Sequence, residues 1–131
     1  MNHIVISSFE NVETGDMQSQ GESIRLFDSE ASARDHFERR SALLESAVAK
    51  SLVDDPDAGF ISWLLLLRMP LDVSDIDEAL EDLELVLEET EEVEDPFGEL
   101  VVAYEGFQQD SDGRREYPQA TALKGLEAWL T

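Results

Sequence analysis

The sequence predicts a single domain over residues 1–131, of the α+β (or α/β) class, with three helices on one face of a mixed sheet of about four strands. Two observations support this two-layer sandwich. Short runs rich in β-branched and aromatic residues alternate with longer stretches whose apolar residues have helical spacing. The length and the 42% hydrophobic content are those of an ordinary globular domain. The expected order of elements is β-β-α-β-α-β-α.

The first two strands are predicted at His3–Ile6 and Ser23–Phe27, which are rich in β-branched and aromatic residues. Between them, Glu13–Asp16 and Gln20–Gly21 supply residues that favour turns at either end of a polar connection. We therefore expect an antiparallel hairpin with a long loop.

A helix follows, with Asp28 or Ser29 as its N-cap, and it ends at the turn-forming segment 54–59. Its outer face carries oppositely charged pairs at i,i+4, including Glu30–Arg34 and Asp35–Arg39. Its inner stripe has helical spacing and is interrupted only by Ser41. The residues of this stripe are Ala33, Phe37, Leu44, Val48 and Leu52.

The apolar run Phe60–Leu67 is ambiguous, because periodicity does not separate a buried strand from a short buried helix. Gly59 precedes the run and Pro70 follows it, which favours a short element. We interpret it as a central strand that is covered on both faces, with a two-turn buried helix as the alternative.

Ser74 is predicted to begin the acidic helix, with Asp77 three residues later in a capping-box arrangement, and Pro96 ends it. Its apolar residues are spaced 3, 4, 3 and 4 apart, which fits a helix packed on a sheet better than a short coiled-coil seam. These residues are Val73, Ile76, Leu80, Leu83 and Leu87.

The last part of the chain reads as a strand at Leu100–Tyr104, a turn at Asp110–Gly113 and a helix at 118–130. The helix is expected to direct Ala122, Leu123, Leu126, Trp129 and Leu130 inward. The large aromatic residues Phe60, Trp63, Tyr104 and Trp129 are expected in the core, because aromatics within apolar runs usually bury their area.

The charge distribution is the most informative functional feature. The net charge is −22, and seventeen carboxylates with no Lys or Arg lie between Arg68 and Arg114. Such a surface attracts a basic protein, so we predict an acidic partner-binding surface on the second helix. Its candidate residues are Asp75, Glu78, Glu81, Asp82, Glu88, Glu89 and Glu92.

Solvent adaptation is favoured over a dedicated basic partner, because acidity along almost the whole chain is more simply explained by surface solvation than by a site. Concentrated salt screens the repulsion between neighbouring carboxylates, so a salt-rich cytoplasm makes this surface tolerable. In composition the chain resembles proteins of extreme halophiles, with two lysines against seven arginines. The interpretation that unites both readings is a non-catalytic interaction or regulatory module with an acidic surface suited to high salt.

Several classes of function are disfavoured by composition. Nine basic residues against thirty-one acids argue against direct binding to nucleic acid or to anionic membranes. The chain has no cysteine and no apolar run of membrane-spanning length, and it begins without the layout of a signal peptide. We expect a cytoplasmic protein.

No motif predicts a catalytic residue, a cofactor or a metal site. His36 has Ser32 and Arg40 at its i−4 and i+4 positions, and Asp110–Gly113 is too short for a calcium loop. Two alternatives remain open, a small enzyme with a carboxylate-containing pocket and a nucleic-acid mimic that occupies a basic groove. A homodimer through the Val73–Leu87 stripe or through the strand Leu100–Tyr104 is a further expectation.

Overall fold

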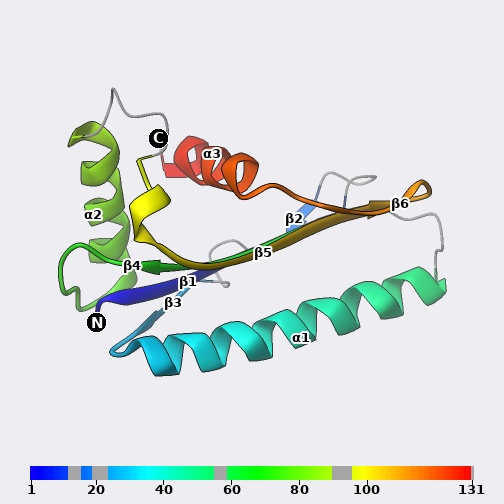
Figure 1. The fold of residues 1–131 in the computed structure, drawn as a ribbon, viewed down its shortest axis with the longest axis horizontal. Helices are drawn as coiled ribbons and strands as arrows, with labels where there is room; N and C mark the ends of the chain where they lie inside the picture. The colour runs from blue at the N-terminus through cyan, green and yellow to red at the C-terminus, as the bar shows by residue number, and fades with distance from the viewer. Residues whose placement is uncertain (12–15, 19–23, 55–58, 90–95, 131) are drawn as a thin grey trace.

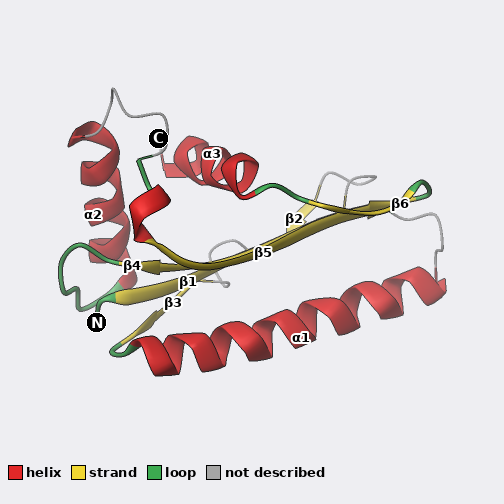
Figure 2. Ribbon diagram, in the orientation of Figure 1, coloured by secondary structure: helices red, strands yellow, loops and turns green. Residues whose placement is uncertain are grey.

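The computed structural model describes residues 1–11, 16–18, 24–54, 59–89 and 96–130. It is an antiparallel sheet with helices on both faces (Figures 1 and 2). The elements are β1 (His3–Asn11), β2 (Asp16–Gln18), β3 (Ile24–Phe27), α1 (Glu30–Asp54), β4 (Phe60–Arg68), α2 (Ile76–Glu89), the short 3-10 helix η2 (Gly98–Leu100), β5 (Val101–Asp110), β6 (Gly113–Glu116) and α3 (Gln119–Leu130). The predicted α+β class is confirmed, and the order of the helices and main strands follows the prediction.

The sheet is antiparallel throughout, so the predicted mixed sheet is wrong. Its order is β2-β1-β4-β5-β6, and β3 pairs with the same strand β1 as β2 does. The crossover through α1 joins β3 to β4, which run in the same direction. They are not neighbours, because β1 lies between them and pairs antiparallel with both.

The sheet has six strands where about four were predicted. The turn predicted at Asp110–Gly113 closes a hairpin between β5 and β6, with Gly113 at a φ of +115°. The strand β6 reads Gly-Arg-Arg-Glu and is exposed along its length, so it lacks the alternation by which strands are recognised. Likewise β2 has only three residues.

The helices cover both faces, so the predicted two-layer arrangement is wrong. Helix α1 packs on one face, and α2 and α3 pack on the other (Figure 1). The cause is the apolar run in β4, whose side chains alternate between faces. Leu64 and Leu66 join the cluster under α1, whereas Leu65 and Leu67 join the core under α2 and α3.

The aromatic predictions are confirmed with one exception. Phe60 and Trp63 are buried, at 3% and 6% exposure, and Tyr104 packs against the core. Trp129 is 40% exposed and therefore not a core residue. It lies at the margin of the α3 stripe, where Ala122, Leu123, Leu126 and Leu130 already fill the contact with the sheet.

None of the helices in the described ranges combines the length and the apolar character that spanning a bilayer demands. Most of the 3,4,3,4 stripe faces inward. Val73 and Leu83 are in the same core as α3, and Leu80 and Leu87 pack against it, whereas Ile76 is 37% exposed. A dimer through the Val73–Leu87 stripe would therefore have to displace this chain's own packing.

Replacing Leu65 with Ala tests the central position of β4. Leu65 is fully buried, so we expect Leu65→Ala to lower the free energy of unfolding by about 2–5 kcal/mol. The matched control is Leu43→Ala on the outer face of α1, where 60% exposure limits the expected change to about 0.5 kcal/mol. Urea unfolding at fixed salt measures both, and equal losses would contradict the assigned core.

Candidate functional site

Helix α2 begins with a capping arrangement one residue later than predicted. Asp75 accepts a hydrogen bond from the Glu78 amide at 2.8 Å, which makes Asp75 the N-cap. The Glu78 carboxylate in turn accepts hydrogen bonds from the Ser74 hydroxyl at 2.7 Å and the Ser74 amide at 3.3 Å. The predicted pair Ser74 and Asp77 is wrong, because the better reciprocal partner, Glu, stands at position 78.

The predicted acidic surface lies on this helix as far as the structure describes it. Asp75 is the N-cap, and Glu78, Glu81, Asp82, Glu88 and Glu89 belong to α2. All are exposed except Asp82, which is half-buried, and Glu92 lies outside the described residues. Two of these carboxylates, Asp75 and Glu78, also form the hydrogen bonds that cap the helix, so they have a structural role besides their charge.

Leu85 lies among the carboxylates of this predicted acidic surface. Its side chain is 50% exposed, although leucine is an apolar residue. Residues three and four positions away are its neighbours on the helix surface. All four of these neighbours are carboxylates, namely Glu81, Asp82, Glu88 and Glu89. We call Leu85 with these four residues the acidic face.

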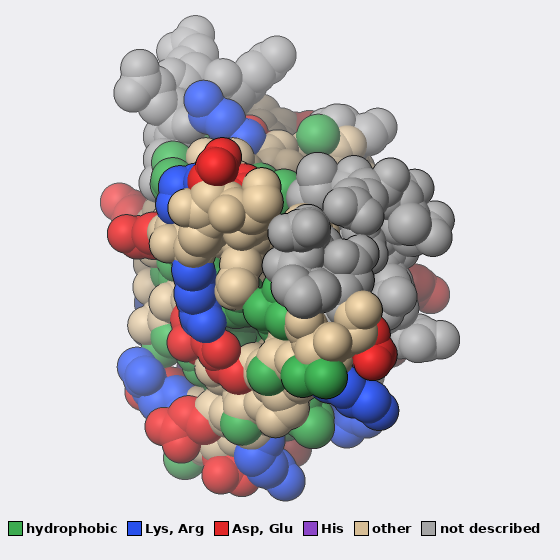
Figure 3. All heavy atoms as spheres, turned by 90° about the vertical axis from the view of Figure 1, so that its right-hand side faces the viewer, with side chains coloured by type: hydrophobic (Ala, Val, Ile, Leu, Met, Phe, Trp, Pro, Cys, Tyr) green, Lys and Arg blue, Asp and Glu red, His purple; other side chains and the backbone are tan. Residues whose placement is uncertain are grey.

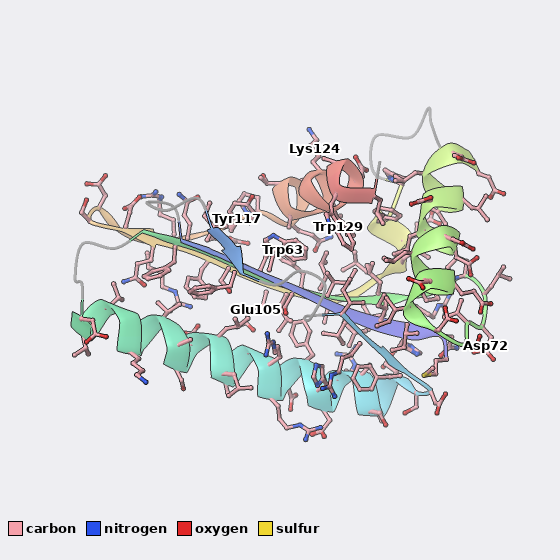
Figure 4. All side chains as sticks on the ribbon, turned by 180° about the vertical axis from the view of Figure 1, so that it is seen from behind. Trp63, Asp72, Glu105, Tyr117, Lys124 and Trp129 are labelled. Atoms are coloured by element: carbon pink, nitrogen blue, oxygen red, sulfur yellow. The ribbon has the colours of Figure 1, made fainter. Side chains whose placement is uncertain are left out.

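Among the described residues, no ion pair involves the acidic face. Every ion pair among the described side chains lies elsewhere, on α1 and on the β5–β6 hairpin. The end of the molecule opposite α2 shows Lys and Arg interleaved with Asp and Glu (Figure 3). Lys124 lies on the neighbouring helix α3 but points away from the sheet (Figure 4). The Arg side chains that form ion pairs in the described chain thus lie away from α2.

Arg68, at the edge of the acidic block, forms no ion pair with another described residue. Asp72 instead accepts a hydrogen bond from the Met1 ammonium group at 2.5 Å, and the Val73 carbonyl accepts a second at 2.7 Å. Asp72 lies close to the start of α2 (Figure 4).

An open cleft of about 590 Å³ lies between β3 and the start of α2. Its apolar lining comes from Ile24, Leu26 and Ile76, of which Ile76 is 37% exposed. Its charged lining comes from Arg25, Asp75 and Asp77, with Met1 at one end. This cleft combines apolar and charged groups, which is typical of a binding site.

The space between α1 and the sheet is much smaller, about 10 Å³, which is room for roughly one water molecule. Here the Ser41 hydroxyl donates to the Glu105 carboxylate at 2.5 Å, and Figure 4 shows Glu105 on the α1 side, opposite Trp63. Arg114 pairs with Glu45 and stacks on the Phe107 ring at 3.8 Å, and its hydrogen bond lowers the pKa of Glu45. These contacts fasten α1 to the sheet and leave no room for a substrate.

His36 lies against the Phe27 ring, with ring centroids 5.1 Å apart, and lines neither space. Burial is the largest cause of the lowered pKa of His36, and the positive charges of Arg25, Arg39 and Arg40 lower this pKa further. Over the described ranges, no three His, Asp or Glu side chains are grouped so as to hold a metal ion.

No family model, no curated protein and no solved structure matches this chain. The function must therefore be argued from its own residues. Sequence reasoning identified the carboxylates but missed Leu85 and the cleft. The signal for Leu85 was available, because it is the one leucine of the helix that falls outside the inward 3,4,3,4 stripe.

Replacing Asp75 with Ala tests the cap. We expect Asp75→Ala to lower the free energy of unfolding by about 0.5–2 kcal/mol, because the Glu78 amide loses its acceptor. Asp77→Ala is the control, since it removes the same charge from the first turn, where no capping hydrogen bond depends on it. Urea unfolding compares the two, and an equal loss for both would show that charge and not capping is responsible.

Proposed function

We propose that this chain is a non-catalytic interaction module whose acidic face binds a basic protein surface that also presents an apolar side chain. One observation carries the proposal, namely a half-exposed leucine with a carboxylate at each of its four neighbouring positions. Burial of Leu85 supplies a favourable contact, and the surrounding carboxylates select a cationic rim on the partner.

A basic partner would also relieve repulsion within α2. Three like-charged i,i+4 pairs, Asp77–Glu81, Glu78–Asp82 and Glu84–Glu88, lie in the described helix. Each costs about 0.2–0.5 kcal/mol at low salt. No ion pair among the described residues involves these carboxylates, so at low salt a partner's Lys or Arg side chains would compensate their charge and steer the encounter.

We further propose that the protein works in a salt-rich cytoplasm, where its overall acidity is a solvent adaptation. At about 1 M salt the Debye length is about 3 Å, so repulsion between exposed carboxylates largely disappears. Solvent adaptation accounts for the acids spread along the chain, but it gives no reason to expose a leucine among them. The acidic face therefore calls for a partner in addition to salt.

The nucleic-acid mimic is less well supported than a basic protein partner. Over its fourteen residues α2 spans about 21 Å and carries seven carboxylates. Duplex DNA presents about twelve phosphates over that length. The enzyme alternative has less support, because the carboxylates of the cleft are exposed and His36 does not line it.

Salt tests the solvent adaptation. We expect the melting temperature to rise between dilute buffer and about 3 M KCl, because screening removes repulsion among the carboxylates. The variant Glu81→Gln/Glu88→Gln/Glu89→Gln should melt higher than the native chain in dilute buffer and gain less from KCl. Circular dichroism measures both proteins, and a melting temperature that is high in dilute buffer and insensitive to KCl would refute the adaptation.

A cationic amphipathic peptide tests the acidic face. The probe contains only Lys and Leu, with leucines at helical spacing, and calorimetry measures its affinity at low and moderate salt. We expect Leu85→Ser to weaken binding by about tenfold, and the triple Glu→Gln variant to weaken it and flatten its salt dependence. Controls are Leu43→Ser and Glu38→Gln/Glu99→Gln/Asp112→Asn, which make equal changes elsewhere. If the control variants weaken binding as much as the acidic-face variants do, the peptide binds by non-specific attraction and the acidic face is not a site.

A further inference from the structure

The strand β3 has one edge without a partner in the described part of the chain. Ile24–Phe27 pair with His3–Ile6 of β1 and with no other described strand. The strand β2 pairs with the far half of the same edge of β1, at Phe9–Asn11, so it does not cover β3. An exposed edge presents amide and carbonyl groups that can pair with another extended chain.

The open cleft lies along this strand. Three consecutive residues of β3, Ile24–Leu26, line one side, and Asp75–Asp77 at the start of α2 line the other. A groove between an edge strand and a helix suits an extended peptide, because the strand offers hydrogen bonds and the helix offers side-chain contacts. The cleft is distinct from the acidic face, since Ile76 and Leu85 point to opposite sides of α2 at 3.6 residues per turn.

We propose that the cleft is a second binding site, which takes an extended segment of a partner protein as an added strand on β3. The segment has alternating apolar and cationic side chains. Its apolar side chains contact Ile24, Leu26 and Ile76, and its Lys or Arg side chains meet Asp75 and Asp77.

Charge decides between a foreign segment and a second copy of this chain. Two copies joined through β3 would bring the starts of two α2 helices, each with Asp75 and Asp77, toward one interface. Like charges at close range oppose that arrangement. A cationic segment instead meets Asp75 and Asp77 in the lining of the cleft. These two carboxylates outnumber Arg25, and the Met1 ammonium is already paired with Asp72.

The described sheet has further edges at β2, at β6 and along the first half of β5. The strand β6 does not offer the same site. Arg114 and Arg115 of β6 are engaged with Glu45 and Asp110, and no residue of β6 lines either of the two spaces described above. Charged side chains on an edge also discourage pairing with another strand.

Two peptides of identical Lys and Leu composition test the proposal. One alternates Lys and Leu for an extended chain, and the other is the helical-period peptide used for the acidic face. We expect Ile76→Ser to lower the affinity for the alternating peptide by about tenfold and to change the affinity for the helical peptide by no more than about twofold. Leu85→Ser should do the reverse. Circular dichroism confirms that each variant is folded, and Leu43→Ser controls for loss of an exposed apolar residue.

Backbone methylation of the alternating peptide tests the added strand. N-methyl groups on every second residue remove the amides from one edge only, because successive amides of a strand point to opposite sides. We expect one methylated series to lose about tenfold in affinity and the other to bind as before. The amides of Ile24–Phe27 should exchange more slowly with deuterium when the unmethylated peptide is bound.

The outcomes separate this proposal from the acidic face. If Leu85→Ser weakens both peptides equally and neither methylated series loses affinity, strand addition is wrong while the acidic face stands. If Leu85→Ser does not weaken binding of the helical peptide while Ile76→Ser still weakens binding of the alternating peptide, the acidic face is wrong and the cleft stands. A dimer in the absence of peptide that Ile76→Ser dissociates would make the occupant a second copy and overturn the foreign segment.

Discussion

The burial of β4 on both of its faces is the constraint on which the rest of the fold depends. This strand lies at the middle of the sheet, and its leucines at positions 64–67 are at most 1% exposed. A strand that is apolar on both sides needs cover on both sides. Helix α1 supplies one cover, and α2 with α3 supplies the other. The position of α2 beside the β3 edge follows, and with it the position of the cleft.

The inner and outer faces of α2 have separate tasks. Ala79 and Leu83 anchor the inner face in the core, and Asp75 with Glu78 fixes its first turn. Since packing and capping hold the helix, its outer face tolerates carboxylates that repel each other. The Arg side chains that form ion pairs in the described chain lie on α1 and β6. The resulting charge asymmetry is a property of the whole chain and not of one helix.

Sequence reasoning succeeded where a pattern was local. The long helix α1, the strand β4 and the helix α3 have clear periodicity or a clear apolar run, and each was predicted close to its observed bounds. The candidate carboxylates were predicted together because the sequence places them in one acidic segment, and those that the structure describes lie on α2 or at its N-cap. The pairing partners of strands, the face that each helix covers and the exposure of Trp129 depend on contacts between distant segments. Leu85 and the cleft depend on the same contacts, so they became visible only in three dimensions.

Salt connects the two proposed sites. In the salt-rich cytoplasm that we propose, screening removes the long-range attraction between an acidic protein and a basic partner. Contact-range interactions survive screening, and each proposed site has one, the apolar side chain of Leu85 on the acidic face and the free backbone groups of β3 in the cleft. Carboxylates then act mainly by excluding acidic competitors at short range, which matters where most surrounding proteins are themselves acidic. The charge therefore provides selectivity, while the apolar and backbone groups provide the affinity.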